Sequence, residues 1–383
     1  MFSTSSIELS RQALRKNLQF IRSLLAPSTR LCSVVKGNAY GHGLPEFVSM
    51  AMREGQEYFA VFSAEEAFTI RQALGISPRV YIMGMIEEPA FDWVLDQAIE
   101  VAVFDWHRLE RLCAHAQEKS QRARIHIELE TGMNRTGFAA KEWPRLAEYL
   151  NQHAESLEII GISTHLAGAE SLSNDFRVRQ QLQVYQEGLS LFEKQGIRPH
   201  LRHAACSAAL LNYPESQFDM VRIGILQYGF WPSQETYVRF SGERGATFNP
   251  LKRIIQWKSK VMSLKLVKRG EFIGYGTSFM AHKAMRLAVI PVGYSYGYTR
   301  SLSNIGKVLI HGKERPVIGT VNMNALTVDV SDLADLQEGE EVVLIGKQGK
   351  QTISVASFGE LSAQMNYELL SRLPMNIPRS IVR

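Results

Sequence analysis

The stretch from Cys32 to Gly43 reads CSVVKGNAYGHG and holds the residues that decide the fold. Its first half is a short, β-branched apolar run closed by glycine, a pattern typical of a buried β-strand. Lys36 stands at the carboxyl end of that strand, where partial desolvation lowers the pKa of an ammonium group. Such a lysine can react as a free amine, which a Schiff base with an aldehyde cofactor requires. On Lys36 alone, a lysine that extends from a strand end into solvent is the favoured interpretation.

Similar apolar runs recur through the first 230 or so residues and predict eight strands. They cover residues 33–35, 58–62, 80–83, 100–104, 125–129, 159–164, 201–205 and 221–226. Helical periodicity fills most of the intervals, as in residues 64–74, which follow Ser63 and have Glu66 in a capping-box position. Eight alternations of strand and helix predict an α/β protein with a (β/α)8 TIM barrel. A doubly wound sheet is the alternative, but no Gly-x-Gly-x-x-Gly turn follows the first strand.

The composition changes after residues 228–233 (YGFWPS), and we expect a second, mainly β domain over residues 237–383. A polar connector at 242–250 leads into alternating segments at 254–261, 287–292, 307–310, 326–330 and 341–345. Helices are expected only at 355–363 and 367–372. The barrel domain therefore spans residues 1–236, with the N-terminal strand as a candidate member of the β domain.

Charge and cysteine content exclude several classes of protein. The net charge of +5 is spread over 43 basic and 38 acidic residues without a basic block, so no nucleic-acid partner is indicated. The three cysteines form neither a metal-binding pattern nor a disulfide framework, and we expect no metal and a reducing compartment. No signal peptide and no apolar stretch long enough for a bilayer are visible, so we expect a cytoplasmic protein without membrane contact.

Polar residues gather at the predicted carboxyl ends of five barrel strands, which lie on one face of such a barrel. These groups are Lys36 and Tyr40 after the first strand, 128–138 after the fifth, His165 after the sixth, 203–207 after the seventh and Arg222 in the eighth. A lone histidine or arginine at a strand end is usually structural. Five such groups on one face are difficult to attribute to packing and indicate an active site.

Several motifs in this order resemble those of the alanine racemase family, enzymes that use pyridoxal 5′-phosphate and combine a barrel with a β domain. The motifs are VKGNAYGHG (35–43), TGMNRTGF (131–138), Thr164-His165, RIGILQYG (222–229), Gly274-Tyr275-Gly276, GYSYGY (293–298), Met323-Asn324 and Asn366-Tyr367-Glu368. The resemblance runs through both predicted domains. It implies an alanine racemase that supplies D-alanine for the cell wall.

The resemblance also implies which residues hold the cofactor. Lys36 would form the Schiff base, and Arg222 would face the pyridine nitrogen as a hydrogen-bond donor that does not give up its proton. His165 is implied to be linked to Arg222. The phosphate would be bound by Ser207, the amides of Gly224 and Ile225, and the hydroxyls of Tyr40 and Tyr367.

Racemisation needs a base on each side of the substrate Cα. The resemblance implies Lys36 for one side and Tyr275, from the partner subunit, for the other, so that a homodimer with shared active sites is expected. A tyrosine is a weak base at neutral pH, and a neutral His165 beside Arg222 would take part in the proton relay.

The substrate amino acid would be bound by Arg135 and the amide of Met323, with Tyr294 at the entrance. Arginine suits a carboxylate because its planar fork donates two parallel hydrogen bonds. Many family members carry a carbamylated lysine where this chain has Glu128. We expect Glu128 to orient Arg135 by direct pairing, without carbonate.

Three further departures from the family leave the substrate open. Asn324 and Tyr296 stand where aspartate is usual, and Cys206 stands where asparagine is usual. Racemisation of serine or of a larger amino acid is therefore one alternative. A pyridoxal-phosphate decarboxylase of basic amino acids is another, although Arg222 and Tyr275 count against it. A single-barrel cofactor carrier is the third, and the second domain counts against it.

Overall fold

The computed structural model describes residues 3–76, 78–244, 249–355 and 366–383. The chain divides into two compact units. One unit, here called the barrel unit, comprises Ala13–Gly37 and Val48–Lys252, and the other, the β unit, comprises Met1–Gln12, Asn38–Phe47 and Arg253–Arg383. Each unit is therefore assembled from segments that are separate in the sequence.

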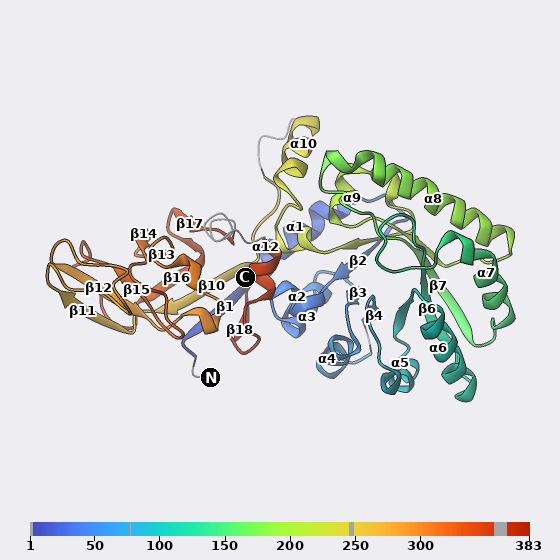
Figure 1. The fold of residues 1–383 in the computed structure, drawn as a ribbon, viewed down its shortest axis with the longest axis horizontal. Helices are drawn as coiled ribbons and strands as arrows, with labels where there is room; N and C mark the ends of the chain where they lie inside the picture. Colours follow the sequence, from blue (N-terminus) through green and yellow to red (C-terminus); the bar gives the residue numbers. More distant parts are fainter. Residues whose placement is uncertain (1–2, 77, 245–248, 356–365) are drawn as a thin grey trace. The chain divides into compact units, whose positions relative to one another are not determined.

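Eight parallel strands form the centre of the barrel unit, and all eight predicted strands are confirmed (Figure 1). Their spatial order is β8-β7-β6-β5-β4-β3-β2-β9. Backbone hydrogen bonds from Asp219 to Arg202 (3.0 Å) and from Arg222 to Ala205 (2.9 Å) join the segments at the two ends of this order. The strands are β2 (Arg30–Val34), β3 (Tyr58–Val61), β4 (Arg79–Ile82), β5 (Glu100–Val103), β6 (Ala123–Glu128), β7 (Leu157–Ser163), β8 (Leu201–His203) and β9 (Met220–Ile223).

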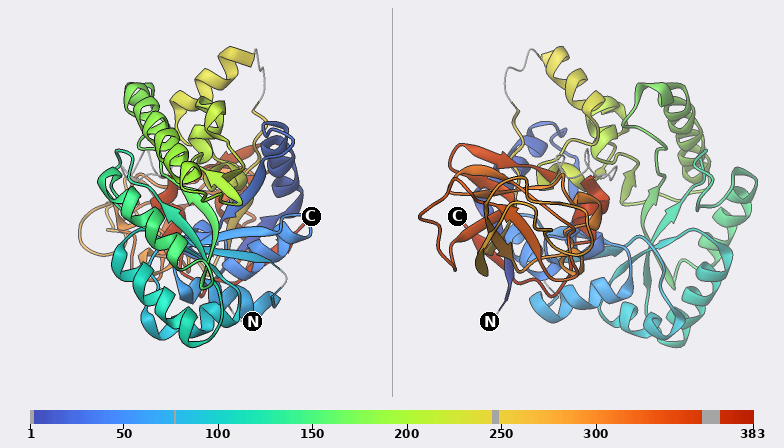
Figure 2. Two further views of the ribbon diagram at one scale, coloured as in Figure 1. Left: turned by 90° about the vertical axis from the view of Figure 1, so that its right-hand side faces the viewer. Right: turned by 60° about the vertical axis from the view of Figure 1, so that its left-hand side comes forward.

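Helices follow the strands and surround them, as the two views of Figure 2 show. The longer ones are α1 (Arg11–Ser23), α3 (Leu44–Met52), α4 (Ala64–Leu74), α6 (Trp106–Glu118), α7 (Trp143–Gln152), α8 (Asp175–Lys194) and α10 (Gln234–Arg244), and shorter ones are α5 (Phe91–Asp96) and α9 (Ser207–Asn212). At the start of α4 the hydroxyl of Ser63 accepts from the amide of Glu66 (3.3 Å), as the capping box predicted.

The strands of the barrel are buried on both faces, because helices cover the outside and side chains fill the inside. Every residue of β3 and of β5 is buried. Strand β5 differs from an ordinary buried strand because it contains a charged residue, Glu100, which is only 1% exposed. A buried carboxylate in this position requires partners, and these are described below.

The β unit contains two sheets. One has the order β14-β13-β16-β10-β1-β18, with β17 paired to β16, and the other has the order β11-β12-β15. An apolar cluster of Val267, Ile273, Ala281, Met285, Leu287 and Ile318 lies in the part of the unit that holds the smaller sheet. The strands are β1 (Ser5–Ser10), β10 (Ile255–Lys260), β11 (Ser263–Val267), β12 (Met285–Ile290), β13 (Lys307–Ile310), β14 (Lys313–Pro316), β15 (Leu326–Asp329), β16 (Glu341–Gln348), β17 (Gln351–Ile353) and β18 (Arg379–Val382).

Several elements differ from the sequence-based prediction. The connector expected from residue 242 is partly helical, because α10 continues to Arg244. Four strands were not predicted: β11, β14, β17 and β18. Many of their residues are exposed and polar, so their sequences do not show the apolar–polar alternation of a half-buried strand. The helix expected at 367–372 is α12 (Asn366–Ser371), whereas residues 356–363 of the other expected helix lie outside the described part.

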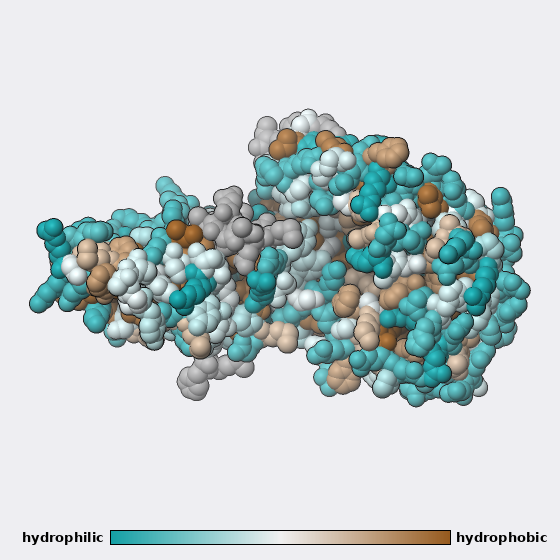
Figure 3. Space-filling view, viewed as in Figure 1, coloured by the Kyte–Doolittle hydropathy of each residue, from teal (hydrophilic) through white to brown (hydrophobic). Residues whose placement is uncertain are grey.

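The visible surface of both units is mostly hydrophilic, with scattered apolar side chains (Figure 3). Within the described ranges, no helix combines the length and the apolar character needed to cross a membrane.

Candidate active site

Lys36 follows β2 directly after Val35, at the carboxyl end of the strand. The residue as a whole is exposed, but protein around its ammonium group lowers its pKa. Burial is the main cause, the positive charge of Arg135 adds to it, and the negative charge of Glu66 opposes it. Lys36 therefore has the lowered pKa expected from its place at a strand end.

The backbone after Lys36 turns in the left-handed sense. The φ angles are 63° at Gly37, 54° at Asn38, 52° at Ala39 and 52° at Tyr40, and together with Lys36 these residues form the short helix α2 (Lys36–Tyr40). A left-handed conformation costs a residue other than glycine about 1–2 kcal/mol. Three consecutive residues bear that cost here, so the surrounding contacts must impose the turn.

Contacts within the β unit hold most of this turn. The Nδ1 atom of His42 lies 3.0 Å from the carbonyl oxygens of both Ala39 and Tyr40, and the carboxamide oxygen of Asn38 accepts from the amide of Leu44 (2.8 Å). Because both partners of His42 Nδ1 are carbonyls, Nδ1 must carry the proton. The histidine and the asparagine thus fix the direction in which the chain leaves Lys36.

Gly41 continues the turn at a point where no side chain fits. Its φ is 78°, and a Cβ atom there would overlap the carbonyl oxygen of Leu370 in α12. The guanidinium of Arg379 donates to the carbonyl of Gly41 (3.0 Å). The rings of Tyr40 and Tyr367 lie in the same unit with centroids 6.0 Å apart, so these two predicted phosphate ligands are neighbours.

Glu66 holds the barrel side of the turn. One carboxylate oxygen accepts from the amide of Gly37 (2.6 Å) and the other from the amide of Phe62 (2.8 Å). Glu66 thus donates its amide to the N-cap residue Ser63 and places its carboxylate beside the turn after Lys36. Only the place of Glu66 at the start of α4 was predictable from the sequence, because its proximity to Gly37 depends on the pairing of β2 with β3.

Arg222 lies in β9 and is 7% exposed. Its Nη2 donates to the carbonyl of Thr164 (2.7 Å), and its Nη1 donates to Nδ1 of His203 and to the carbonyl of the same residue (3.1 Å). The acidic neighbour Asp219 is occupied by Arg202 instead (2.7 Å). Among the described residues, Arg222 thus forms no ion pair with Asp219, although the two are close in the sequence.

The histidine bonded to Arg222 is His203, and no hydrogen bond between the His165 ring and Arg222 occurs in the described structure. His165 follows β7, and its carbonyl accepts from the side chain of Gln181 (3.0 Å). Burial, and then the positive charge of Arg222, lower the pKa of His165 to about 3. His165 is therefore neutral at physiological pH, but Arg222 acts on it through space and not through a direct bond.

The loop after β6 presents Arg135. The carboxylate of Glu130 accepts from the amides of Gly132 and Asn134 (2.8 Å for Asn134), which closes the loop on itself. Glu130 directly precedes the motif of residues 131–138, and its role was not predicted from the sequence. Arg135 is exposed, and in the described structure no carboxylate forms an ion pair with its guanidinium.

Glu128 does not pair directly with Arg135, contrary to our expectation. Its carboxylate accepts instead from the hydroxyl of Thr136 (3.0 Å). Burial raises the pKa of Glu128, while the Thr136 hydrogen bond and the charges of Arg222 and Arg135 oppose the rise. The loop thus brings the hydroxyl of Thr136, the residue after Arg135, to the carboxylate of Glu128 in place of the guanidinium.

The ends of β8 and β9 bring Ser207 and Gly224 together. The hydroxyl of Ser207 accepts from the amide of Gly224 (3.1 Å), and Ile225 begins the next turn. Both Ser207 and Ile225 are buried. A hydroxyl and two successive amides at this end of a barrel are groups that bind phosphate in other barrels.

Three further predicted residues lie in the β unit. Tyr275 is 75% exposed and stands between two glycines with positive φ angles, of 77° and 71°. Its carbonyl accepts from the hydroxyl of Thr320 (3.3 Å). An exposed tyrosine ring on a tightly turned backbone packs poorly, which favours a role in binding over a role in the core.

Tyr294 and Met323 are held next to each other. The amide of Tyr294 donates to the carbonyl of Asn322 (3.0 Å), and the amide of Ser295 donates to that of Met323 (3.0 Å). The carboxamide of Asn324 donates to the hydroxyl of Ser295 (3.1 Å). The departure from the family at Asn324 is therefore part of the contact between these two segments.

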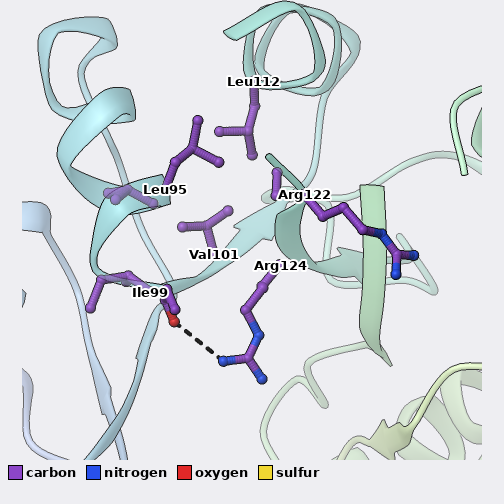
Figure 4. Close-up of a pocket in the computed structure, with 9 residues that line it drawn as sticks. Leu95, Ile99, Val101, Leu112, Arg122 and Arg124 are labelled. Carbon is purple, nitrogen blue, oxygen red and sulfur yellow. Dashed lines mark hydrogen bonds between the residues drawn. The ribbon is translucent and has the colours of Figure 1, made fainter. Parts of the chain in front are cut away.

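The pocket of Figure 4 belongs to a different part of the barrel unit. It is lined mainly by apolar residues of α5, β5 and α6 and by Arg122 and Arg124 near the amino end of β6. None of the residues described above lines it. The candidate site therefore rests on side-chain chemistry at the strand ends and not on this pocket.

Comparisons with known proteins cover most of the chain. A family model described as "Alanine racemase, N-terminal domain" matches residues 9–232, and one described as "Alanine racemase, C-terminal domain" matches residues 254–381. An alanine racemase of Symbiobacterium thermophilum is 34% identical over 97% of this chain and 95% of its own length.

Solved structures show the same architecture. An alanine racemase from Streptomyces lavendulae has a TM-score of 0.89 and 28% identity, covering 100% of this chain and 98% of that one. An alanine racemase from Bartonella henselae with covalently bound pyridoxal phosphate has a TM-score of 0.84 and 26% identity, with 100% of both chains covered.

Proposed function

Because the chain belongs to the alanine racemase family, we propose that it interconverts L- and D-alanine with pyridoxal 5′-phosphate bound covalently to Lys36. The observation that supports this most strongly is the place of Lys36 at the carboxyl end of β2, where burial and the charges of Arg135 and Arg222 lower its pKa. An amine with a lowered pKa is available for a Schiff base at neutral pH.

The residues of the barrel unit fit this cofactor. Within the described structure, the Nη atoms of Arg222 have acceptors, and its Nε–H has none. That donor suits a pyridine nitrogen. Ser207 and the amide of Ile225 suit the phosphate, and the amide of Gly224 would exchange its bond to the Ser207 hydroxyl for one to the phosphate. By resemblance to the family, the hydroxyls of Tyr40 and Tyr367 would complete its binding.

The bound cofactor would supply the electron sink that makes the Cα proton of the amino acid acidic. Arg222 would limit the electron-withdrawing strength of the cofactor ring, because a guanidinium does not give up its proton to the ring nitrogen. Arg135 would bind the substrate carboxylate with its free guanidinium, and the amide of Met323 would add a donor. Tyr294 would narrow the entrance.

Two bases would act on opposite sides of Cα. Lys36, once released by the substrate, would hold or give a proton at Nζ on one side. Tyr275 of the partner subunit would do so through its hydroxyl on the other, and the neutral His165 would accept and return protons for it. The exposed position of Tyr275 in the single chain supports a residue that serves another subunit.

The proposal includes a homodimer in the cytoplasm. Three free cysteines, Cys32, Cys113 and Cys206, are consistent with a reducing compartment. Size-exclusion chromatography with light scattering tests the dimer. A monomer that still racemises alanine would contradict the shared active site.

The central experiment combines labelling with isotope exchange. Borohydride treatment of the protein loaded with pyridoxal 5′-phosphate should tag the peptide that contains Lys36. L-alanine in deuterated water should gain deuterium at Cα and lose optical activity. Tyr275→Phe should keep the Lys36 tag and slow racemisation about 100-fold or more, the usual effect of removing a general base. Exchange without racemisation, or a tag elsewhere, would contradict the proposal.

A broader substrate range is the alternative that a specific contact favours. Asn324 and Tyr296 replace charged residues of the family next to Tyr294 and Met323, and Asn324 contacts Ser295 there. The same deuterium assay with a panel of amino acids tests it. Faster exchange of serine than of alanine would move the assignment to a serine racemase.

A further inference from the structure

Four buried side chains form a continuous line of hydrogen bonds inside the barrel. Arg222 Nη1 donates to Nδ1 of His203, Nε2 of His203 lies 2.9 Å from Nδ1 of His126, and Nε2 of His126 lies 3.0 Å from the carboxylate of Glu100. Their exposed fractions are 7%, 0%, 0% and 1%. The line starts at β9, crosses β8 and β6, and ends at the amino end of β5.

Burial keeps both imidazoles neutral. It is the main cause that lowers the pKa of His203 and of His126, and the positive charge of Arg222 adds to it in each case. For His126 the carboxylate of Glu100 acts in the opposite sense, without reversing the shift. A neutral imidazole has one donor and one acceptor nitrogen.

The fixed donor at one end then determines every proton in the line. A guanidinium can only donate, so Nδ1 of His203 accepts and its proton is on Nε2. That proton points at Nδ1 of His126, which must accept, so the proton of His126 is also on Nε2. It is donated to Glu100, which as a carboxylate can only accept.

Glu100 has donors on both oxygens. Its Oε1 accepts from Arg79 Nε (2.9 Å) and Nη2 (2.6 Å) and lies 3.3 Å from Arg124. Its Oε2 accepts from His126 and from the hydroxyl of Tyr58. Arg124, drawn in Figure 4, also reaches the carbonyl of Ala98 (3.4 Å). Both oxygens must therefore be acceptors.

We propose that Glu100 is a positioning residue for Arg222, which it holds through His126 and His203 in their Nε2–H forms. His203, the first member of the line, accepts a hydrogen bond from Nη1, and the carbonyl of Thr164 accepts one from Nη2. The guanidinium is thereby fixed in rotation, with Nε–H left for a ligand. This inference rests on the proposed function only for the identity of that ligand.

An amide in place of Glu100 should disturb the line as far as Arg222. The NH2 group of glutamine cannot face Arg79 and Arg124, because both only donate. If it faces His126, then Nε2 of His126 must accept, and both histidines must move their protons to Nδ1. Nδ1–H of His203 would then meet Nη1–H of Arg222, donor against donor. Glu100→Gln thus either breaks the line or displaces Arg222.

Nitrogen-15 NMR of the full chain with labelled histidine tests the proton positions directly, without cofactor. Protonated and unprotonated imidazole nitrogens differ clearly in shift, and His126→Leu and His203→Leu assign the two residues among the ten histidines. We expect both wild-type residues in the Nε2–H form. An Nδ1–H form at either residue would overturn the proposal, whatever the chain catalyses.

Kinetics of the loaded enzyme test the consequence at Arg222. Glu100→Gln should lower kcat about 10- to 100-fold, the range expected when a hydrogen bond to a charged group is lost, with a small change in KM. Arg124→Gln is the matched control. It removes a charge beside Oε1, leaves both donors on Oε2, and should leave kcat and the histidine shifts unchanged.

If Glu100→Gln does not fold, His126→Leu still tests the proposal. It breaks the line of hydrogen bonds but keeps the ion pairs of Glu100 with Arg79 and Arg124. A folded His126→Leu protein, judged by circular dichroism, should show the same loss in kcat, because the Nε2–H of His203 has then lost its acceptor. Wild-type kcat in a folded variant of either kind would overturn the positioning role. If the wild-type protein loaded with cofactor does not racemise alanine, the proposed function is contradicted, and the positioning proposal is judged by the NMR experiment.

Discussion

The carboxylate of Glu128 accepts a hydrogen bond from the hydroxyl of Thr136 (3.0 Å), and Arg135 influences it only through space. A glutamate carries its charge without carbon dioxide. We therefore predict that activity in carbonate-depleted buffer at mildly acid pH equals activity with added bicarbonate. Glu128→Lys should create a dependence on bicarbonate and serves as the positive control. Stimulation of the wild type by bicarbonate would contradict the prediction.

Glu66 should set the pKa of Lys36 from the opposite side. It is the acidic group that raises this pKa against burial and against Arg135. Glu66→Gln should therefore lower the pKa of Lys36 further, so that borohydride-trapped labelling by pyridoxal phosphate reaches its plateau at lower pH. Glu65→Gln, one residue earlier on α4, is the matched control and should leave the labelling curve in place. A shift to higher pH would show that another charge dominates.

Buried neutral histidines should make the fold sensitive to acid. Burial lowers the pKa of His42 to about 4, and that of His165 to about 3, from an ordinary value of 6.5. Below pH 6.5 the unfolded chain binds protons that the folded chain does not, so stability falls as the pH falls. Each such histidine contributes up to about 1.4 kcal/mol per pH unit.

Urea unfolding at pH 7.5, 6 and 5 measures this loss. His42→Gln should lower stability at pH 7.5 and flatten its decline towards pH 5. His200→Gln, at an exposed position, controls for the loss of a histidine as such. An unchanged slope in His42→Gln would exclude a contribution of His42 to acid sensitivity.

Substitutions of Gly37 and Gly41, which follow Lys36, should distinguish the cost of backbone strain from the cost of steric overlap. Both have positive φ, but a Cβ on Gly37 would meet nothing within 4 Å, whereas one on Gly41 would overlap Leu370. Gly37→Ala should cost about 1–2 kcal/mol, the cost of the left-handed conformation alone. Gly41→Ala should cost clearly more, because the backbone must also move. Equal midpoints of thermal unfolding in the two variants would show that the turn can relax.

The sequence predicted those parts of the fold and the site that depend on local pattern. All eight barrel strands appear as short, largely apolar runs, and the residues at their carboxyl ends follow from the geometry of a barrel. Contacts between distant strands were not predictable. The bond between Arg222 and His203, in place of His165, depends on the neighbouring positions of β8 and β9. The pairing of Glu128 with Thr136 depends on a loop conformation that no periodicity encodes.

The polar line from Glu100 to Arg222 was equally hidden. Its members are spread from β5 to β9, and a lone histidine in a strand is most often a core residue. Once the strand order is known, however, their alignment follows from which side chains point into the barrel. Folded topology is thus the missing information, and not further sequence motifs.

The pairing of β1 with both β10 and β18 has a consequence for biosynthesis. Most of the barrel unit lies between β1 and its two partners in the sequence, so β1 leaves the ribosome before the barrel, and β10 and β18 leave it afterwards. The barrel can therefore acquire its shape while β1 is still unpaired on both edges, because β10 and β18 both follow it in the chain. Any premature stop upstream of Arg379 would therefore leave an open strand edge, ready to capture other nascent chains.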